Sequence, residues 1–137
     1  SACLVGSEMC IRDRHILFAI SSLGHGDRIA IADCGLPVPK GVWCIDLAIV
    51  MGVPSFQEVV EAVAAELVIQ RIIIAQEMRV SNPKQYGFIK TLFRDISIEE
   101  IPHTIFKEEL RGVKAVIRTG EATPYSNVIF ESGVAFP

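Results

Sequence analysis

Three consecutive isoleucines at positions 72–74 constrain the fold of this chain more than any other feature of its sequence. A strand with one exposed face alternates apolar and polar residues, whereas an uninterrupted apolar run needs cover on both faces. Such strands are typical of parallel sheets that carry helices on each side. The run 71–78 therefore predicts an interior strand of an α/β fold.

Both flanks of this strand predict helices. Ser55 and Glu58 form the pattern S-x-x-E, a capping box that satisfies two free amides of a first helical turn. Apolar residues follow at helical spacing, namely Val59, Val60, Val63 and Leu67. Beyond the strand, Pro83 follows Asn82 and suits the first position of another helix, where its missing N–H is no loss.

The rest of the chain continues this alternation. The predicted elements are a short helix over 15–23, strands over 28–33, 113–120 and 127–134, an apolar run over 42–50, a short strand or edge segment over 96–103, and a helical turn or two over 104–110. We therefore predict a single α/β domain with a mainly parallel sheet flanked by helices.

The composition limits which kinds of molecule the protein is expected to bind. The 137 residues carry a formal net charge of −3, so no basic surface for nucleic acid is expected. No run of about 18 or more apolar residues occurs, which predicts that nothing spans a membrane. The mean hydropathy is nevertheless high for so small a domain. We therefore expect subunit interfaces to bury part of the apolar surface.

Cofactor motifs are missing from the sequence. The four cysteines, Cys3, Cys10, Cys34 and Cys44, match neither a zinc site nor a disulfide framework. Their mostly apolar neighbours predict buried, reduced thiols of a cytosolic protein. Because clustered metal ligands, a G-x-G-x-x-G pattern and a P-loop are also absent, we expect neither a metal nor a nucleotide cofactor.

Two residues are the first candidates for chemistry. His25 lies between Gly24 and Gly26, where the bare backbone either exposes the imidazole for function or simply ends a helix beside a cationic side chain. Asp33 closes a buried strand, and ligands gather outside the carboxyl ends of strands in open α/β sheets. The alternative for Asp33 is a turn ahead of Gly35.

Other polar residues are weaker candidates when each is taken alone. Position alone favours a surface role for His15 and for His103. Tyr125 and Asn127 share a proline-containing loop, where a phenol and an amide either hold sugar hydroxyls or only shape a turn. No local pattern assigns a role to Asp27, Asp46, Glu121 and Glu131. This set of groups suits proton transfer on a small polyol better than redox or phosphoryl chemistry.

Four blocks of sequence occur in one order: L-G-H-G-D, I-A-D-C-G-L-P-V-P, I-D-L-A-I-V-M-G-V-P-S-F and V-I-R-T-G-E-A-T-P-Y-S-N-V-I. Together they resemble the D-ribose pyranase family, also called the RbsD family, over about residues 15–137. The related fucose mutarotases share G-H-G-D and G-E-x-x-x-Y-x-N but lack the D-x-G-L-P-x-P and G-V-P-S-F character. The ribose branch is therefore favoured.

The resemblance implies an isomerase that interconverts the β-pyranose and β-furanose forms of D-ribose in the cytoplasm, with no metal or nucleotide. It implies that His25 is the proton donor. The residues that it implies for sugar binding are Asp33, His103, Tyr125, Ser126 and Asn127. It also implies a ring-shaped homodecamer whose sites lie between neighbouring subunits, which would bury the excess apolar surface.

Two other functions stay open at this point. One is a mutarotase for fucose or another sugar, which only exchanges anomers. The other is a non-catalytic, sugar-binding accessory of a sugar transporter. The exchange of ribose ring forms separates the three.

The first 14 residues depart from the family pattern, because Arg12-Asp13-Arg14 stands where the family usually has Leu-Asn. The segment C-L-V-G-S-E-M-C-I-R-D-R resembles translated adapter sequence. We therefore expect residues 1–14 to be a non-native or disordered segment and residues 15–137 to form the domain.

Overall fold

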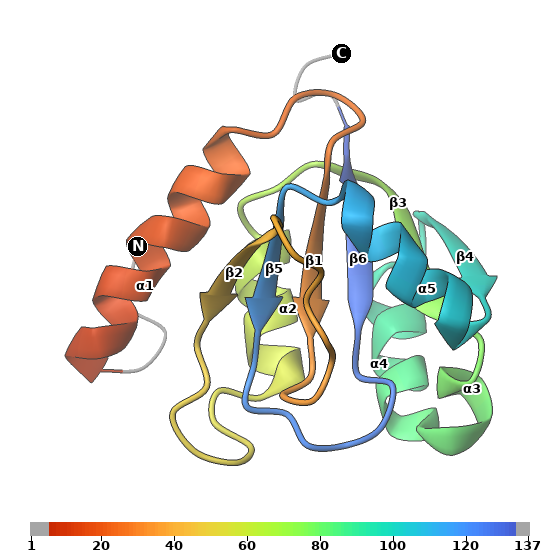
Figure 1. Cartoon of the computed structure of the whole chain (residues 1–137). Coiled ribbons are helices and arrows are strands. Elements are labelled where there is room, and N and C mark those ends of the chain that lie inside the picture. Colours follow the sequence, from red (N-terminus) through yellow and green to blue (C-terminus); the bar gives the residue numbers. More distant parts are fainter. Residues whose placement is uncertain (1–5, 134–137) are drawn as a thin grey trace.

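A six-stranded sheet runs through the middle of the protein (Figure 1). The computed structural model describes the backbone of residues 6–133 and the side chains of residues 14–133. The strands are β1 (Arg28–Ala32), β2 (Trp43–Asp46), β3 (Ile69–Ala75), β4 (Ser97–Ile101), β5 (Ala115–Arg118) and β6 (Val128–Ser132), in the order β2-β5-β1-β6-β3-β4. β6 is antiparallel to β1 and β3, and the other pairs are parallel. The predicted α/β fold with a mainly parallel sheet is confirmed.

Helices cover both faces of this sheet. They are α1 (Gly6–Ser21), α2 (Phe56–Ala64), α3 (Met78–Ser81), α4 (Pro83–Leu92) and α5 (His103–Glu109), and a single 3₁₀ turn, η1 (Leu110–Gly112), follows α5. Figure 1 shows α5 in front of the sheet and α2 and α4 behind it. Within residues 6–133, no helix has both the length and the apolar character needed to cross a membrane.

The two faces of β1 explain this layering. Ile29 and Ile31 point into a core that also contains residues of α1, α2 and α4. Ala30 and Ala32 point the other way, into a smaller core with Phe106 of α5. Because successive strand residues face opposite sides, a continuous apolar strand is stable only when helices cover both sides.

Two helices begin at the predicted capping signals. The Ser55 hydroxyl accepts from the Glu58 amide at 3.2 Å, and the Ser55 amide donates to the Glu58 carboxylate at 3.0 Å, which completes the capping box of α2. The Asn82 side chain accepts from the Gln85 amide, and Pro83 is the first residue of α4. Both predictions are confirmed.

Several predicted elements have different bounds in the structure. The helix predicted over 15–23 begins earlier, at Gly6, since no proline interrupts residues 7–21. The apolar run 42–50 gives only the four residues of β2, because the Asp46 carboxylate accepts from the Ala48 amide at 3.0 Å and turns the chain. That residues 1–14 are a non-native or disordered segment stays a prediction.

The cysteines differ from their prediction at one position. Cys34 is exposed in the loop after β1, and Cys44 is partly buried in β2; both are free thiols. The prediction of buried thiols is wrong for Cys34, because the chain leaves the sheet at Asp33. Cys3 and the side chain of Cys10 lie outside the described residues.

Candidate functional site

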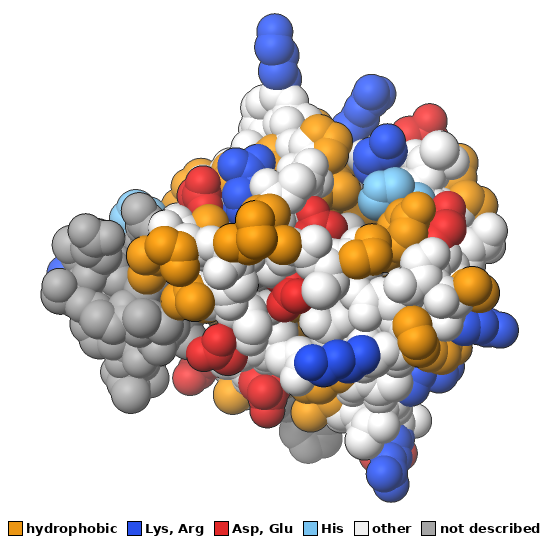
Figure 2. Space-filling view, turned by 90° about the horizontal axis from the view of Figure 1, so that it is seen from below, with side chains coloured by type: hydrophobic (Ala, Val, Ile, Leu, Met, Phe, Trp, Pro, Cys, Tyr) orange, Lys and Arg blue, Asp and Glu red, His pale blue; other side chains and the backbone are white. Residues whose placement is uncertain are grey.

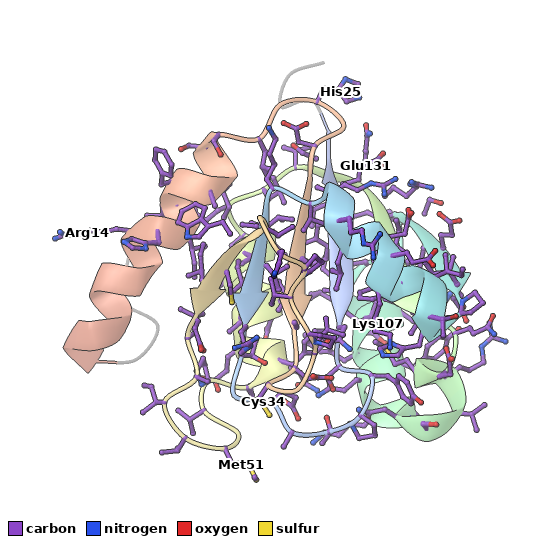
Figure 3. All side chains as sticks on the ribbon, in the orientation of Figure 1. Arg14, His25, Cys34, Met51, Lys107 and Glu131 are labelled. Carbon is purple, nitrogen blue, oxygen red and sulfur yellow. The ribbon has the colours of Figure 1, made fainter. Side chains whose placement is uncertain are left out.

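The topology brings most of the predicted site residues to one end of the sheet. Asp33 directly follows β1, and His103 lies two residues after β4. Asn127 directly precedes β6, which runs in the opposite direction, so its start meets the carboxyl ends of the parallel strands. Cys34 and Lys107 mark this end of the molecule in Figure 3.

Asp33 both closes a turn and lies in this cluster. Its carboxylate accepts from the Gly35 amide at 3.0 Å, which is the turn that the sequence allowed. Its own amide donates to the side-chain oxygen of Asn127 at 2.8 Å, which ties the end of β1 to the start of β6. Burial raises the pKa of the Asp33 carboxyl, although the Gly35 amide, the nearby side chain of Asn127 and the charge of His103 oppose the shift.

His103 faces Tyr125 across the same cluster. Their rings lie edge to face with centroids 5.0 Å apart. The His103 amide donates to the carboxylate of Glu77 at 3.0 and 3.2 Å, which fixes the first turn of α5. Burial lowers the pKa of the His103 imidazole, and the charge of Lys107 lowers it further. The ring is therefore mainly neutral near pH 7.

Hydrogen bonds of buried side chains stabilise the loop that carries Tyr125. The Asn82 amide nitrogen donates to the Pro124 carbonyl at 2.8 Å and to the Ser126 hydroxyl at 3.2 Å. Ser126 is fully buried, and its hydroxyl also lies 2.7 Å from that of Thr123. The side chain of Ser126 thus stabilises the loop from the inside, and its predicted contact with a ligand stays a prediction.

Tyr125 itself occupies an uncommon backbone conformation. Its φ of 58° lies in the left-handed region, which L residues with bulky side chains rarely adopt. The carbonyl of Tyr125 accepts from the Asn127 amide at 2.9 Å, which closes the turn. Such conformations concentrate at functional sites, where the surrounding structure holds them.

Two polar nitrogens of the cluster are buried without a partner. In the part of the chain whose side chains are described, the buried side-chain atoms that lack a hydrogen bond are His103 Nδ1, Asn127 Nδ2 and Arg118 Nε. A buried polar group without a partner costs about 1–3 kcal/mol. A hydroxyl-bearing ligand at this end of the sheet would supply partners for the first two.

His25 lies at the opposite end of the sheet. It occupies the turn between α1 and β1, where Gly26 adopts a φ of 86° and its amide donates to the Ser132 carbonyl at 2.9 Å. The carboxylate of Asp27 accepts from the Gly24 amide at 2.8 Å and closes this turn. Figure 3 shows His25 and Glu131 at one end and Cys34 and Lys107 at the other. A single chain therefore does not bring His25 to Asp33.

Sequence reasoning missed several residues around the cluster. Glu77 follows β3 with only its position after a strand as a signal. Lys107 lies four residues after His103 on α5, a spacing that places both on one helix face. Asn82 was interpreted only as a helix cap, and its second role depends on a loop some 40 residues away in sequence. His15, by contrast, is exposed beside Trp43, as predicted for a surface residue.

The chemistry available at this end of the sheet is that of hydroxyl binding and proton transfer. A carboxylate, an amide, an imidazole and a phenol come from Asp33, Asn127, His103 and Tyr125. The described side chains contain no group of three or more histidine, cysteine or acidic residues arranged to hold a metal ion. The cluster suits a small polyhydroxy compound.

Comparison with known proteins points in the same direction. Residues 9–135 match the model of the RbsD / FucU transport protein family. A D-ribose pyranase of Bacillus licheniformis is 49% identical over 126 residues, which cover 92% of this chain and 96% of that protein. A D-ribose pyranase of Clostridium perfringens is 46% identical over 122 residues, covering 89% and 93%.

Solved structures show the same similarity. The structure of Bacillus subtilis RbsD complexed with D-ribose superimposes with a TM-score of 0.88 at 44% identity, and covers 89% of this chain and 93% of that one. The fucose mutarotase of Streptococcus pneumoniae, in complex with L-fucose, gives a TM-score of 0.76 at 19% identity over 97% and 96% of the two chains. The second similarity shows a shared fold alone.

Proposed function

Because the chain belongs to the RbsD / FucU transport protein family, we propose that it is a D-ribose pyranase, an isomerase that interconverts the pyranose and furanose forms of D-ribose. The observation that carries the proposal is the similarity to D-ribose pyranases over nearly the whole chain. The β-anomers are the forms that we assign to the reaction. The cytoplasm, where ribose is phosphorylated as a furanose, is the compartment that we assign to the protein.

The reaction is a ring opening followed by a different ring closure. In opening, the ring oxygen gains a proton and the anomeric hydroxyl loses one, so that the bond between C1 and the ring oxygen breaks and an aldehyde forms. In closure, the hydroxyl on C4 adds to the aldehyde carbon and loses its proton, while the carbonyl oxygen gains one. Atoms and protons balance over the two steps, and a positioned acid and base accelerate both.

His25 supplies the acid in this proposal. An imidazole has an ordinary pKa of about 6.5 and so exchanges a proton readily near neutral pH. Asp33, His103, Tyr125 and Asn127 hold the sugar hydroxyls at the carboxyl end of the sheet. The unpartnered nitrogens of His103 and Asn127 support this assignment, since a hydroxyl group can both donate and accept a hydrogen bond.

A neighbouring subunit brings the two ends of the sheet together in this proposal. His25 and Asp33 lie at opposite ends of one chain, so a complete site needs His25 from a second copy. A closed ring, which we assign as a homodecamer, gives each subunit one such neighbour on each side. Each interface then holds one complete site.

Exposed apolar residues beside the cluster support assembly. Val50 and Met51 are 61% and 81% exposed, in a loop that follows β2. This loop lies against Gly120, where a Cβ atom would come within 2.5 Å of the Val53 carbonyl oxygen, so only glycine permits the contact. Figure 2, seen from this end of the molecule, shows hydrophobic side chains exposed between charged ones. Burial of these two side chains between subunits would remove exposed apolar surface from water.

Saturation-transfer NMR on D-ribose tests the proposed function directly, because each ring form has its own anomeric signal. The wild-type protein is expected to exchange pyranose and furanose signals, and His25→Ala is expected to slow the exchange about 10²- to 10⁴-fold. His15→Ala, which changes an exposed histidine beside Trp43, is the matched control and should retain the rate.

Two outcomes would contradict this proposal. Exchange confined to fucose anomers would make the protein a fucose-type mutarotase. Ribose binding without exchange in the wild type would make it a non-catalytic accessory of a sugar transporter.

A further inference from the structure

The imidazole of His25 is the first member of a chain of three side chains. Its Nε2 atom lies 2.9 Å from the side-chain oxygen of Gln70 on β3. The side-chain nitrogen of Gln70 in turn donates to a carboxylate oxygen of Glu131 on β6 at 2.7 Å. Sequence reasoning had given Glu131 no role.

Glu131 is held as an anion. Its other carboxylate oxygen accepts from Arg28 at 3.1 Å and from Arg71 at 3.3 Å. Although burial opposes it, the hydrogen bonds from Gln70 and Arg28 and the charge of Arg71 keep the pKa of Glu131 below its ordinary value. An ionised carboxylate accepts hydrogen bonds and donates none.

This anion fixes the orientation of the Gln70 amide. Because Glu131 can only accept, Gln70 must turn its NH₂ group toward Glu131, and its carbonyl oxygen then faces His25. A carbonyl oxygen also only accepts, so His25 Nε2 must carry a hydrogen. In a neutral imidazole the other ring nitrogen, Nδ1, is then free of hydrogen.

The backbone under His25 is fixed as well. The Asp27 carboxylate closes the turn through the Gly24 amide at 2.8 Å, and it lies 3.9 Å from the Lys114 ammonium group. The Gly26 amide donates to the Ser132 carbonyl, one residue beyond Glu131. The turn and the side-chain contact therefore both attach His25 to the end of β6.

We propose that Gln70 and Glu131 are positioning residues that keep the hydrogen of His25 on Nε2, so that Nδ1 is the atom that gives and takes the proton of the sugar. This inference rests on the proposed role of His25. It adds the atom through which the histidine acts and the two side chains that select it. The second ring nitrogen is the one that the Gln70 contact leaves available to a neighbouring subunit.

The test combines a tautomer measurement with kinetics. Long-range ¹H–¹⁵N correlation spectra report which ring nitrogen of a neutral histidine carries the hydrogen, and the His25 signals are assigned by their loss in His25→Gln. In the wild type, the neutral imidazole of His25 is expected as the Nε2–H form. In Gln70→Leu the form with the hydrogen on Nδ1 should appear, and kcat for ribose exchange should fall about 10- to 100-fold with KM nearly unchanged.

A double variant that exchanges the two side chains separates the positioning role from damage to the fold. Gln70→Glu combined with Glu131→Gln places a carboxylate oxygen beside His25 Nε2 and an amide donor beyond it. The Nε2–H form should return, with recovery of most of kcat. Gln57→Leu, on α2, is the matched control and should change neither tautomer nor kcat.

The outcomes separate this inference from the proposed function. If the wild type exchanges ribose but Gln70→Leu keeps the Nε2–H form and the wild-type kcat, the positioning role is wrong and the function stands. Failure of the exchanged pair to restore the tautomer would also overturn the positioning role. If the wild type does not exchange ribose, the proposed function fails, whatever the tautomer of His25.

Discussion

The buried nitrogens of His103 and Asn127 that lack a hydrogen bond are the atoms to which a bound sugar would supply partners. Both belong to side chains that the fold holds by their other atoms: the Asn127 oxygen accepts from the Asp33 amide, and the His103 ring packs against the rings of Phe106 and Tyr125. The free atoms therefore have fixed positions before a ligand arrives. Preorganisation of this kind lowers the ordering cost of binding.

Residue chemistry also sets a pH dependence of stability. The pKa of His103 is lowered by burial and by Lys107, so the folded protein resists protonation of this ring more than the unfolded chain does. Neutral His103 therefore contributes to the free energy of unfolding. This contribution is complete above the ordinary pKa of 6.5, and it is lost as the pH falls from there through the lower pKa of the folded state. The free energy of unfolding should therefore decrease on acidification in this window.

Urea denaturation of the wild type and of His103→Asn, at one protein concentration from pH 8 to pH 5, measures this effect. The variant should show a smaller decrease. Asp33 acts with the opposite sign and in a more acidic range, since its raised pKa favours the protonated form in the folded state. Equal slopes for the two proteins would show that His103 does not titrate as described.

At the scale of elements, α5 depends on a residue from another element. The residue that precedes α5 is Pro102, and it makes no side-chain capping bond. The carboxylate of Glu77, which follows β3, accepts from the first amide of the helix instead. A negative charge at a helix N-terminus stabilises the helix. The contact of Glu77 with the His103 amide also holds His103 where its ring faces Tyr125.

Replacement of Glu77 tests this arrangement. Glu77→Ala should lower the free energy of unfolding by about 1 kcal/mol, as for the loss of a helix cap. It should also lower the pKa of His103 further, because the charge of Glu77 opposes the present shift. Denaturation and NMR titration of His103 measure the two effects. Glu77→Gln keeps an acceptor without the charge, so it should lose less stability but show the same direction of pKa change; an unchanged pKa in both variants would contradict this account.

The elements themselves could be predicted where their signals are local. The Ser55 capping box, Pro83 after Asn82 and the isoleucines of β3 each act within a few residues, and the structure confirms all three. The antiparallel direction of β6 was not predicted, because it depends on pairing with β1 and β3, which lie far away in the sequence. The contacts of Glu77 and Gln70 were not predicted either, because their partners also lie far away in the sequence.

At the scale of the whole molecule, the two ends of the sheet explain why sequence spacing was a poor guide to the site. His25 and Asp33 are only eight residues apart, but β1 runs between them and carries them to opposite ends. His103 and Asn127 lie much farther along the chain and still meet Asp33. The resemblance to a family implied a set of site residues, whereas composition and spacing did not show where the fold places them.

In the proposed pyranase site, His25 comes from one subunit and Asp33 from its neighbour. Co-expression of His25→Ala and Asp33→Ala chains with different tags gives mixed oligomers, and saturation-transfer NMR measures their ribose exchange. Random assembly should restore about a quarter of the wild-type rate, because a site is complete only when each chain faces the other variant in the right order. A mixture of Asp33→Ala and Asn127→Ala, whose changes lie at the same end, should restore none; recovery absent from the first mixture as well would contradict a shared site.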